Sequence, residues 1–469
     1  MGNASIENVR YNMAFIWLIC LVAAMGGLLF GYDWVVVGGA RAFYEPFFHI
    51  TEKPFWQGFA SSTALFGCIL GAMISGVLSD RFGRKRLLIL SGLMFTVSAL
   101  WTAMAWDFVS FNMARFLGGV GIGLASNLSP MYIAEISPAE SRGRFVSVNQ
   151  LTIVIGILIA QLTNLLIAQP VESEATTEMI LQSWNGQYGW RWMFGAETVP
   201  ALAFFLLMFF VPESPRWLLK YERCEKATRI LTRIGGDDYA KFEVADIKDT
   251  IASKEVARVR FGDLLERRLF RVVFLGVFLA AFQQWCGINV IFYYAVEVFK
   301  AAGKDVSDLM FSIVITGIVN LAFTFVAIFT VDRIGRRALM LVGAAGLAGI
   351  YAVLGTGFFL QCTGVHMLIL VVAAIACYAM SLAPITWVVI SEIFPNRIRG
   401  AAMSIAVLSL WICCSLVAFT FPMLNRGLGA HGAFWLYGAI CVVGFVVILL
   451  KLPETKGKSL EDIERELVD

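Results

Sequence analysis

Long apolar runs alternate with short polar stretches along almost the whole chain. A helix that crosses a membrane needs about 20 apolar residues, because each residue rises about 1.5 Å through a hydrocarbon core about 30 Å thick. Lipid offers no hydrogen-bond partner to unpaired backbone groups, and these runs are too long for tilted barrel strands, so each is predicted to be an α-helix. Twelve runs qualify: residues 13–38, 56–79, 86–106, 110–134, 145–169, 191–211, 270–298, 308–331, 338–361, 366–394, 400–424 and 431–451. The expected fold is an all-α integral membrane protein with twelve transmembrane helices.

The composition agrees with a membrane protein. Hydrophobic residues make up 59% of the 469 residues and charged residues 15%, against about 45–50% and about 25% in an ordinary soluble domain. A net charge of +3 without a long basic tract gives no footprint for nucleic acid. The polar start leads into a long apolar run without a small-residue cleavage site, which favours a retained first helix over a removable signal peptide.

Metal, cofactor and nucleotide sites are not expected. Seven of the nine cysteines lie inside apolar runs, where a free thiol behaves as a small hydrophobe. The three histidines are far apart in sequence and are not grouped with other ligand types. The glycines of residues 118–123 follow no strand, so they favour close helix packing over a nucleotide loop.

Arginine and lysine gather in every second loop. Because cytoplasmic loops are enriched in these residues, we expect those loops and both termini to be cytoplasmic. The loops between them are poorer in cations, and the first contains Arg41 and Lys53. The cation-rich loops carry Arg81, Arg84, Lys85 and Arg86; Arg142 and Arg144; Arg333, Arg336 and Arg337; and Arg397 and Arg399.

The chain repeats itself across one long charged insert. Residues 221–268 are dense in charge with helix-spaced apolar positions, and predict short cytoplasmic helices. On either side, DRFGRK at 80–85 recurs as DRIGRR at 332–337, EISP at 135–138 as EIFP at 392–395, and PES at 212–214 as PET at 453–455. We therefore expect two six-helix bundles, over residues 1–220 and 269–469. Such a duplicated architecture is typical of carriers that rock one half against the other around a midplane site.

The repeated motifs place carboxylates and guanidinium groups at cytoplasmic helix ends. They predict a latch that holds the cytoplasmic face shut and parts as the halves rock. The alternative is that they only anchor loops and fix topology. The residues are Asp80, Arg84, Glu135, Arg142, Glu213 and Arg216 in the first half, and Asp332, Arg336, Glu392, Arg399 and Glu454 in the second.

These motifs also carry a family resemblance over nearly the whole chain. The DRxGR loops resemble the signature of the major facilitator superfamily, and PESPRW at 212–217 with PETKG at 453–457 resembles its sugar porter family. Within that family the pattern is most similar to bacterial D-xylose–proton symporters, and more distantly to mammalian facilitative glucose carriers. The resemblance implies a monomeric, multi-pass carrier of the bacterial inner membrane, whose partners are a monosaccharide, a proton and the bilayer.

Three ionisable residues fall inside predicted helices: Asp33, Arg115 and Glu197. A charge at the bilayer centre costs about 2.5–3.5 kcal/mol even on the lenient insertion scale, so such residues are functional by default. Asp33 either stays ionised beside a cation or takes up a proton to escape desolvation, and these two outcomes make a switch. The alternative is a permanent structural ion pair. In the family that the chain resembles, an aspartate at this position accompanies proton coupling, while uniporting relatives carry a neutral residue.

Amide and aromatic residues inside the predicted helices suit a sugar. Asn and Gln offer both donors and acceptors to hydroxyls, while Trp and Tyr cover the flat C–H faces. Interhelical hydrogen bonding and plain packing are the alternative. The stretch QQWCGIN at 283–289 resembles the sugar-binding stretch of the family, and several other positions match its binding residues. The predicted sugar site comprises Phe30, Gln150, Gln283, Gln284, Asn289, Tyr293, Asn320, Trp387 and Trp411.

Four positions depart from the xylose symporter pattern. Ile157 stands where a second Gln is usual, Leu410 where an amide is usual, Ala383 where a Gly is usual, and Trp34 where a small residue is common. The first three put xylose selectivity in question, and Trp34 bears on proton access. The leading function is therefore proton-driven import of a monosaccharide, with D-xylose indicated by the pattern and a hexose–proton symporter or a uniporter as the alternative. A non-transporting sugar sensor and a membrane enzyme are disfavoured.

Overall fold

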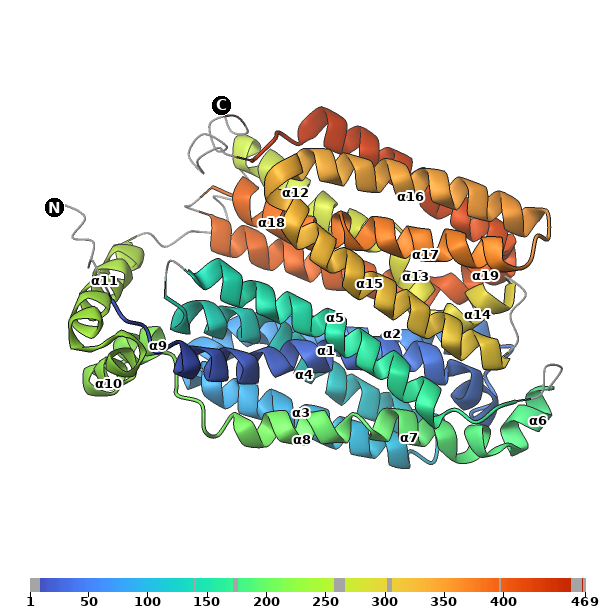
Figure 1. Ribbon diagram of the computed structural model, residues 1–469, viewed down its shortest axis with the longest axis horizontal. Coiled ribbons are helices and arrows are strands. Elements are labelled where there is room, and N and C mark those ends of the chain that lie inside the picture. Colours follow the sequence, from blue (N-terminus) through green and yellow to red (C-terminus); the bar gives the residue numbers. More distant parts are fainter. Residues whose placement is uncertain are drawn as a thin grey trace.

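The structure, a computed structural model, describes residues 9–138, 141–171, 176–256, 266–301, 306–395, 398–456 and 466. Within these residues the chain is helical and forms no strand. The helices make two bundles, with α1–α8 drawn in blue to green and α12–α19 in yellow to red (Figure 1). Three further helices, α9–α11, lie at the end of the molecule where α1 begins and α19 ends (Figure 1), here called the terminal end. The other end is called the far end.

The first bundle consists of five long helices and a broken sixth. The sixth crossing is interrupted, since α7 and α8 are separated at Ala196 and Glu197. The elements are α1 (Met13–Phe47), α2 (Pro54–Phe82), α3 (Arg84–Met104), α4 (Phe108–Ile136), α5 (Arg142–Ile167), α6 (Thr177–Gln182), the π-helical turn η2 (Asn185–Gly189), α7 (Trp190–Gly195) and α8 (Thr198–Leu207).

The second bundle has more breaks. The connecting helices are α9 (Pro215–Lys220), α10 (Cys224–Gly235) and α11 (Asp237–Val256), and residues 257–265 of the predicted insert lie outside the described residues. The bundle itself comprises α12 (Arg267–Trp285), α13 (Ile288–Tyr293), α14 (Ala295–Ala301), α15 (Val306–Ile334), α16 (Arg336–Phe359), α17 (Val365–Ala379), α18 (Leu382–Ile393) and α19 (Arg399–Lys451).

The helices account for twelve crossings. Ten stretches of the described chain are long and apolar enough to cross a membrane. One of them holds two crossings, because the backbone of α19 leaves the helical conformation at Gly429, with φ 69° and ψ 170°. Glycine adopts this left-handed conformation without the steric cost of a Cβ. The broken pair α7 and α8 supplies the remaining crossing, so the predicted number is confirmed.

Four predicted spans differ in detail from the observed helices. Residues 191–211, 270–298 and 366–394 are each predicted to be continuous, but all three are interrupted. The breaks lie between α7 and α8, at Gly287 with φ 84°, and at Met380 and Ser381 between α17 and α18. The apolar run continues through each break, so hydropathy does not reveal it. The first span was expected to end at residue 38, yet α1 continues to Phe47. Arg41, expected in a loop, therefore lies inside this helix and is only 1% exposed.

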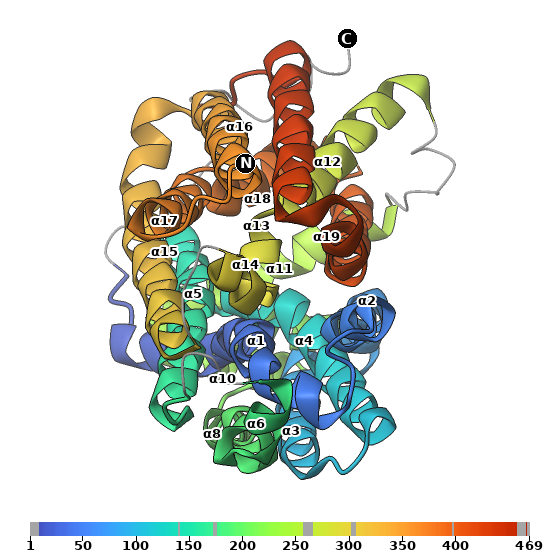
Figure 2. The same ribbon diagram turned by 90° about the vertical axis from the view of Figure 1, so that its right-hand side faces the viewer.

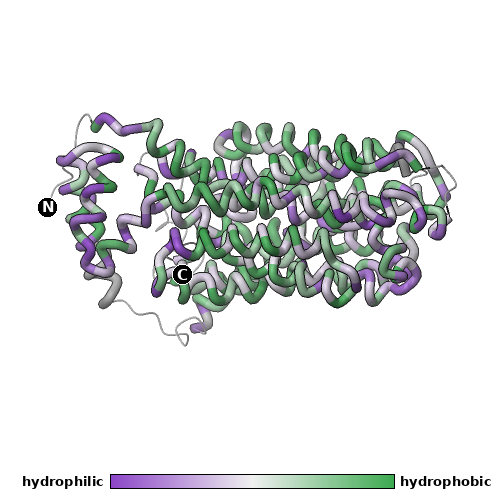
Figure 3. The backbone as a smooth tube through the Cα atoms, turned by 90° about the horizontal axis from the view of Figure 1, so that it is seen from below, coloured by the Kyte–Doolittle hydropathy of each residue, from purple (hydrophilic) through white to green (hydrophobic). Residues whose placement is uncertain are grey.

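The distribution of hydropathy fits a membrane protein. Hydrophobic residues fill the long middle of the molecule, and hydrophilic residues gather at its two ends (Figure 3). Large apolar side chains face outward from this middle, among them Val199 at 75% and Val443 at 56% exposure. Such a surface suits contact with lipid tails.

Glycines bring helices into close contact within the first bundle. A Cβ on Gly119 of α4 would lie 1.9 Å from the Ala64 carbonyl oxygen of α2. Similarly, a Cβ on Gly31 of α1 would lie 1.9 Å from the Ile153 carbonyl oxygen of α5. The packing interpretation of the α4 glycines is thus confirmed.

The two bundles meet along four pairs of elements. Helix α1 contacts α13 and α14, α2 contacts α19, and α5 contacts α15. The end-on view shows these neighbours side by side (Figure 2). This places α1, which carries Asp33, directly at the interface between the bundles.

Candidate functional site

A cluster of three ionisable side chains lies inside the first bundle. Asp33 of α1, Arg115 of α4 and Glu197 between α7 and α8 are each 3% exposed. Arg115 Nη1 donates a hydrogen bond to Asp33 Oδ1, and its Nη2 lies 3.4 Å from the Asp33 carbonyl oxygen. Glu197 interacts electrostatically with both of the other residues. The structure thus brings together all three residues of the predicted proton site.

The charges of this cluster do not balance. Two carboxyl groups face one guanidinium, so the cluster carries one negative charge when both carboxyls are ionised. Asp33 Oδ2, Arg115 Nε and Glu197 Oε1 are buried and have no hydrogen-bond partner among the described atoms. A single proton would neutralise the cluster, and burial makes that neutral state favourable.

A cluster of amides occupies the break between α12 and α13. Gln283 Nε2 donates to the carbonyl oxygens of Leu382 and Ala383, at 3.2 and 2.9 Å. Asn289 Nδ2 donates to Gln284 Oε1. After the left-handed turn at Gly287 a new helix, α13, begins. The turn brings the Asn289 side chain within hydrogen-bonding distance of Gln284. The three predicted amides are each 3% exposed and retain further hydrogen-bonding capacity.

Four aromatic rings from both bundles gather beside the ionisable cluster. Phe30 and Trp34 come from α1, Tyr293 from α13 and Trp411 from α19. The ring centroids of Phe30 and Trp411 are 5.6 Å apart, and those of Trp34 and Tyr293 are 5.9 Å apart with nearly parallel planes. These rings are here called the aromatic cluster.

The ionisable and aromatic clusters share one small cavity. The cavity measures about 10 Å³ and is lined by Asp33 and Arg115 together with all four rings of the aromatic cluster. Cys414 connects the rings to the amides, since its Sγ lies 3.8 Å from Asn289 Nδ2 and 3.9 Å from the Tyr293 hydroxyl. The predicted proton-coupling residues Asp33 and Arg115 therefore lie next to groups suited to a sugar.

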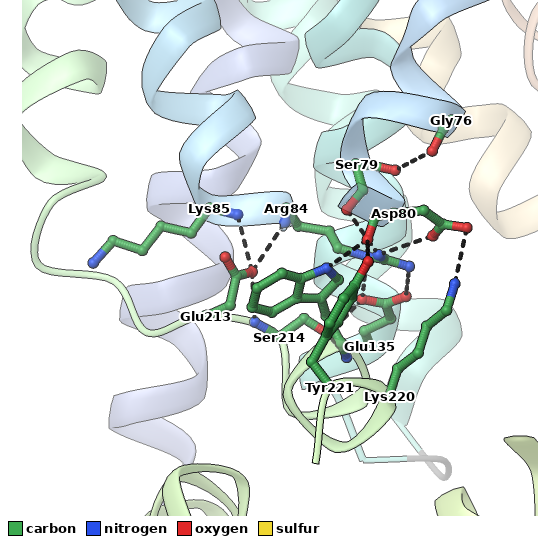
Figure 4. Close-up of polar contacts among 11 residues, drawn as sticks. Gly76, Ser79, Asp80, Arg84, Lys85, Glu135, Glu213, Ser214, Lys220 and Tyr221 are labelled. Atoms are coloured by element: carbon green, nitrogen blue, oxygen red, sulfur yellow. Dashed lines mark hydrogen bonds and ion pairs between the residues drawn. The ribbon is translucent and has the colours of Figure 1, made fainter. Parts of the chain in front are cut away.

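A separate ionic network lies at the terminal end of the first bundle. The Arg84 guanidinium donates to both carboxylate oxygens of Glu135, at 3.0 and 2.9 Å, and to Asp80 at 3.3 Å. Glu213 Oε1 accepts from the backbone nitrogens of Arg84 and Lys85, each at 3.0 Å, and so caps α3 (Figure 4). Burial raises the pKa of the Glu213 carboxyl, although backbone hydrogen bonds from Lys85, Ser214 and Arg84 act to lower it.

The second bundle repeats this network. Arg336 Nη2 lies 3.5 Å from Glu392 Oε1, and Glu454 accepts from the backbone nitrogens of Arg336 and Arg337 at 2.9 and 3.1 Å. Burial acts to raise the pKa of Glu454, but backbone hydrogen bonds from Lys456, Arg336, Arg337 and Ala338 together lower it. The two equivalent carboxylates therefore have pKa values shifted in opposite directions.

Comparisons with known proteins identify the family. The model of the family described as "Sugar (and other) transporter" matches residues 19–467. The chain belongs to this sugar transporter family of the major facilitator superfamily. It is 39% identical to the D-xylose-proton symporter of Escherichia coli K12, over 97% of this chain and 96% of that protein. The arabinose-proton symporter of Bacillus subtilis is 37% identical, over 97% and 96% of the two chains.

Solved structures lead to the same family. The inward open conformation of the xylose transporter XylE from E. coli matches with a TM-score of 0.83 and 38% identity, covering 96% of this chain and 100% of that one. XylE bound to 6-bromo-6-deoxy-D-glucose matches with a TM-score of 0.78 and 38% identity, covering 97% and 100%.

Three of the predicted sugar-site residues of this transporter lie apart from the clusters. Gln150 on α5 and Trp387 on α18 are half-buried, and Asn320 on α15 is 6% exposed. No hydrogen bond or ring contact among the described residues joins them to the amides or the aromatic cluster. The remaining predicted residues, Phe30, Gln283, Gln284, Asn289, Tyr293 and Trp411, are brought together.

Two of the predicted latch arginines of this transporter pair with carboxylates of their own bundle. Arg84 pairs with Asp80 and Glu135, and Arg336 lies beside Glu392. Arg142 lies near Glu243 and Tyr239 of α11, and Arg216 is half-buried on α9. The side chains of Asp332 and Arg399 lie outside the described residues. A latch between the halves stays a prediction.

Sequence reasoning missed a second buried ion pair. Arg41 Nη2 lies 2.6 Å from Glu45 Oε1, and Arg41 Nη1 donates to Ser61 Oγ at 2.9 Å. The Arg41 guanidinium also lies 4.1 Å from the centre of the Tyr294 ring, which belongs to the second bundle. The spacing of four residues between Arg41 and Glu45 could have indicated a helix that continues past residue 38. Together they line a pocket of about 530 Å³ at the far end.

Proposed function

We propose that this sugar transporter is a proton-coupled symporter that imports a monosaccharide across the bacterial inner membrane by alternating access. D-xylose is the leading candidate for that monosaccharide. The observation that carries this proposal is the shared cavity, in which Asp33 and Arg115 line the same space as the aromatic cluster. Proton exchange and sugar binding at adjacent groups can bias each other through the same helices.

The unbalanced charge of the ionisable cluster supports coupling to one proton. With Asp33 ionised, its hydrogen bond to Arg115 is charge-assisted and holds α1 against α4. Protonation of Asp33 removes that charge and weakens the bond. Helix α1 also carries Phe30 and Trp34. If α1 moves away from α4, these two rings would move relative to the rings of the second bundle.

The chemistry of the two remaining clusters supports a sugar as the cargo. The amides of Gln283, Gln284 and Asn289 can exchange hydrogen bonds with a ring of hydroxyl groups, while the aromatic rings cover its apolar faces. The relatives named above are symporters of xylose and arabinose. A relative at 35% identity, the galactose-proton symporter of E. coli, favours a hexose as the second candidate.

The contacts between the bundles support an inward-open arrangement with cytoplasmic termini. Arg426 Nη1 donates to the Glu52 carbonyl oxygen at 3.1 Å, and the Phe55 and Phe419 ring centroids are 5.4 Å apart. These contacts, with Arg41 and Tyr294, join the bundles at the far end. The cation-rich loops lie at the terminal end, which the positive-inside rule makes cytoplasmic.

The decisive experiment is uptake of labelled D-xylose into proteoliposomes with and without an imposed pH gradient. The wild type should accumulate xylose when the interior is alkaline. Asp33→Asn, which cannot release a proton, should lose accumulation completely yet retain exchange of labelled for unlabelled sugar. Asp238→Asn, a matched change at an exposed carboxylate of α11, should behave as the wild type.

Two results would contradict the proposal. Accumulation by Asp33→Asn at the wild-type level would remove Asp33 from the coupling. Equilibration without accumulation in the wild type would make the protein a uniporter. Competition by glucose and galactose in the same assay separates a pentose carrier from a hexose carrier.

A further inference from the structure

Trp34 is an unassigned member of the aromatic cluster. It follows Asp33 directly on α1, and its indole contacts three rings: Phe30 at 4.9 Å, Tyr293 at 5.9 Å and Trp411 at 6.1 Å between centroids. All three neighbours belong to the predicted sugar site. Trp34 itself was noted only for its bearing on proton access.

The position of Trp34 limits the space available beside the sugar-site rings. Its plane lies within 3° of the Tyr293 ring plane, so the two rings face each other across the bundle interface. The cavity that they line with Phe30 and Trp411 measures about 10 Å³, which holds about one water molecule. Trp34 is half-buried, so part of the indole remains open to a bound molecule.

We propose that Trp34 is a size-determining wall of the sugar site that restricts the cargo to pentopyranoses. This inference rests on the proposed sugar transport. D-Xylopyranose and D-glucopyranose present the same ring and the same arrangement of ring hydroxyls, but D-glucopyranose, like other hexopyranoses, carries an additional hydroxymethyl group. When the bundles close on a sugar, the indole occupies space that this group would need, whereas amide hydrogen bonds serve both sugars alike.

The expected discrimination follows from the size of the added group. One methylene more or less in an apolar pocket changes selectivity by about 10–200-fold. The wild type should therefore transport D-xylose at least about tenfold faster than D-glucose at equal concentrations. Trp34→Thr should shift the ratio of xylose to glucose rates by about tenfold or more toward glucose, and Trp34→Phe should shift it less.

The test is counterflow of labelled D-xylose and D-glucose in proteoliposomes without a pH gradient, so that proton coupling does not enter. Trp106→Thr provides a matched control, because Trp106 is 71% exposed and remote from the cluster. It should leave the ratio unchanged. Because counterflow runs without a pH gradient, a changed ratio in Trp34→Thr reports altered size selection and not a damaged proton site.

The possible outcomes separate this inference from the proposed function. Absence of counterflow for every monosaccharide in the wild type would defeat the proposed function. Equal wild-type rates for xylose and glucose, or an unchanged ratio in Trp34→Thr, would overturn the role of Trp34 and leave sugar transport intact. If Trp34→Thr does not fold, the ratio for Trp34→Phe decides, since it retains an aromatic ring of smaller size.

Discussion

The Asp33 carboxyl and the Arg115 guanidinium form an ion pair whose surroundings are deficient in partners. A buried pair is stable when further hydrogen bonds satisfy its remaining atoms. Here Asp33 Oδ2 and Arg115 Nε lack such bonds among the described atoms. These unsatisfied atoms distinguish the pair from a fully bonded structural ion pair, and they agree with the coupling role proposed for it.

The residue that links the amides is Gln284, which accepts from Asn289 and donates to Gln283 at 3.4 Å. We expect Gln284→Ala to weaken sugar binding by about 5–150-fold, because a buried hydrogen bond left unmade costs about 1–3 kcal/mol. The dissociation constant for D-xylose, measured by isothermal titration calorimetry on purified protein, checks this. Gln182→Ala on α6, where the side chain is exposed, is the control. An unchanged affinity in Gln284→Ala would place the sugar elsewhere.

The sequence reveals a site residue when its residue type is rare inside an apolar helix. Asp33, Arg115 and Glu197 stand out because charges are rare inside membrane helices. Arg41 carries the same signal, but its place near the end of an apolar run favoured a loop. Trp34 was visible only as a departure from a family pattern, since one more aromatic residue among apolar neighbours gives no pattern of its own.

Among the helices, the long apolar runs were sufficient to predict the crossings but not their interruptions. The breaks at Glu197 and Gly287 depend on packing against other helices, which hydropathy along one run does not record. Gly287 gives the one local signal, because its positive φ suits glycine and a Cβ there would lie 2.5 Å from the Tyr437 ring. The interruption is what lets Asn289 reach Gln284.

Glu213 and Glu454 cap the starts of α3 and α16, and their contributions to stability should respond to pH in opposite ways. The pKa of Glu213 in the folded protein is raised above its ordinary value of 4.5. Between these two pKa values the folded state binds more protons at Glu213 than the unfolded state does. The contribution of Glu213 to stability is therefore lost as the pH rises through the folded pKa. The lowered pKa of Glu454 means that its contribution is present above pH 4.5 and is lost as the pH falls below it.

Thermal unfolding of detergent-purified variants between about pH 3.5 and 7 separates these contributions. Glu213→Gln should flatten the stability curve on the alkaline side of pH 4.5, and Glu454→Gln should flatten it on the acid side. Matching pH profiles in the two variants would contradict the opposite shifts.

Considering the two bundles together, the repeated ionic networks predict a role in setting the balance between conformations. If they form a cytoplasmic latch, charge reversal at Arg84 or Arg336 should raise the inward-open population and slow net transport several-fold. Distances between spin labels on the terminal ends of α4 and α18 would report the population. Arg229→Glu, on the exposed side of α10, controls for a change of charge alone. Unchanged distances and rates would leave the networks as loop anchors.

The ion pair at the far end bears on how easily the molecule reopens there. Arg41 has Glu45 and Ser61 as partners within the first bundle, and its guanidinium stacks on the Tyr294 ring of the second bundle. Separating a cation from an aromatic face costs about 0.5–2 kcal/mol, only a few times the thermal energy. This stacking contact can therefore break and re-form in every turnover without a large barrier of its own.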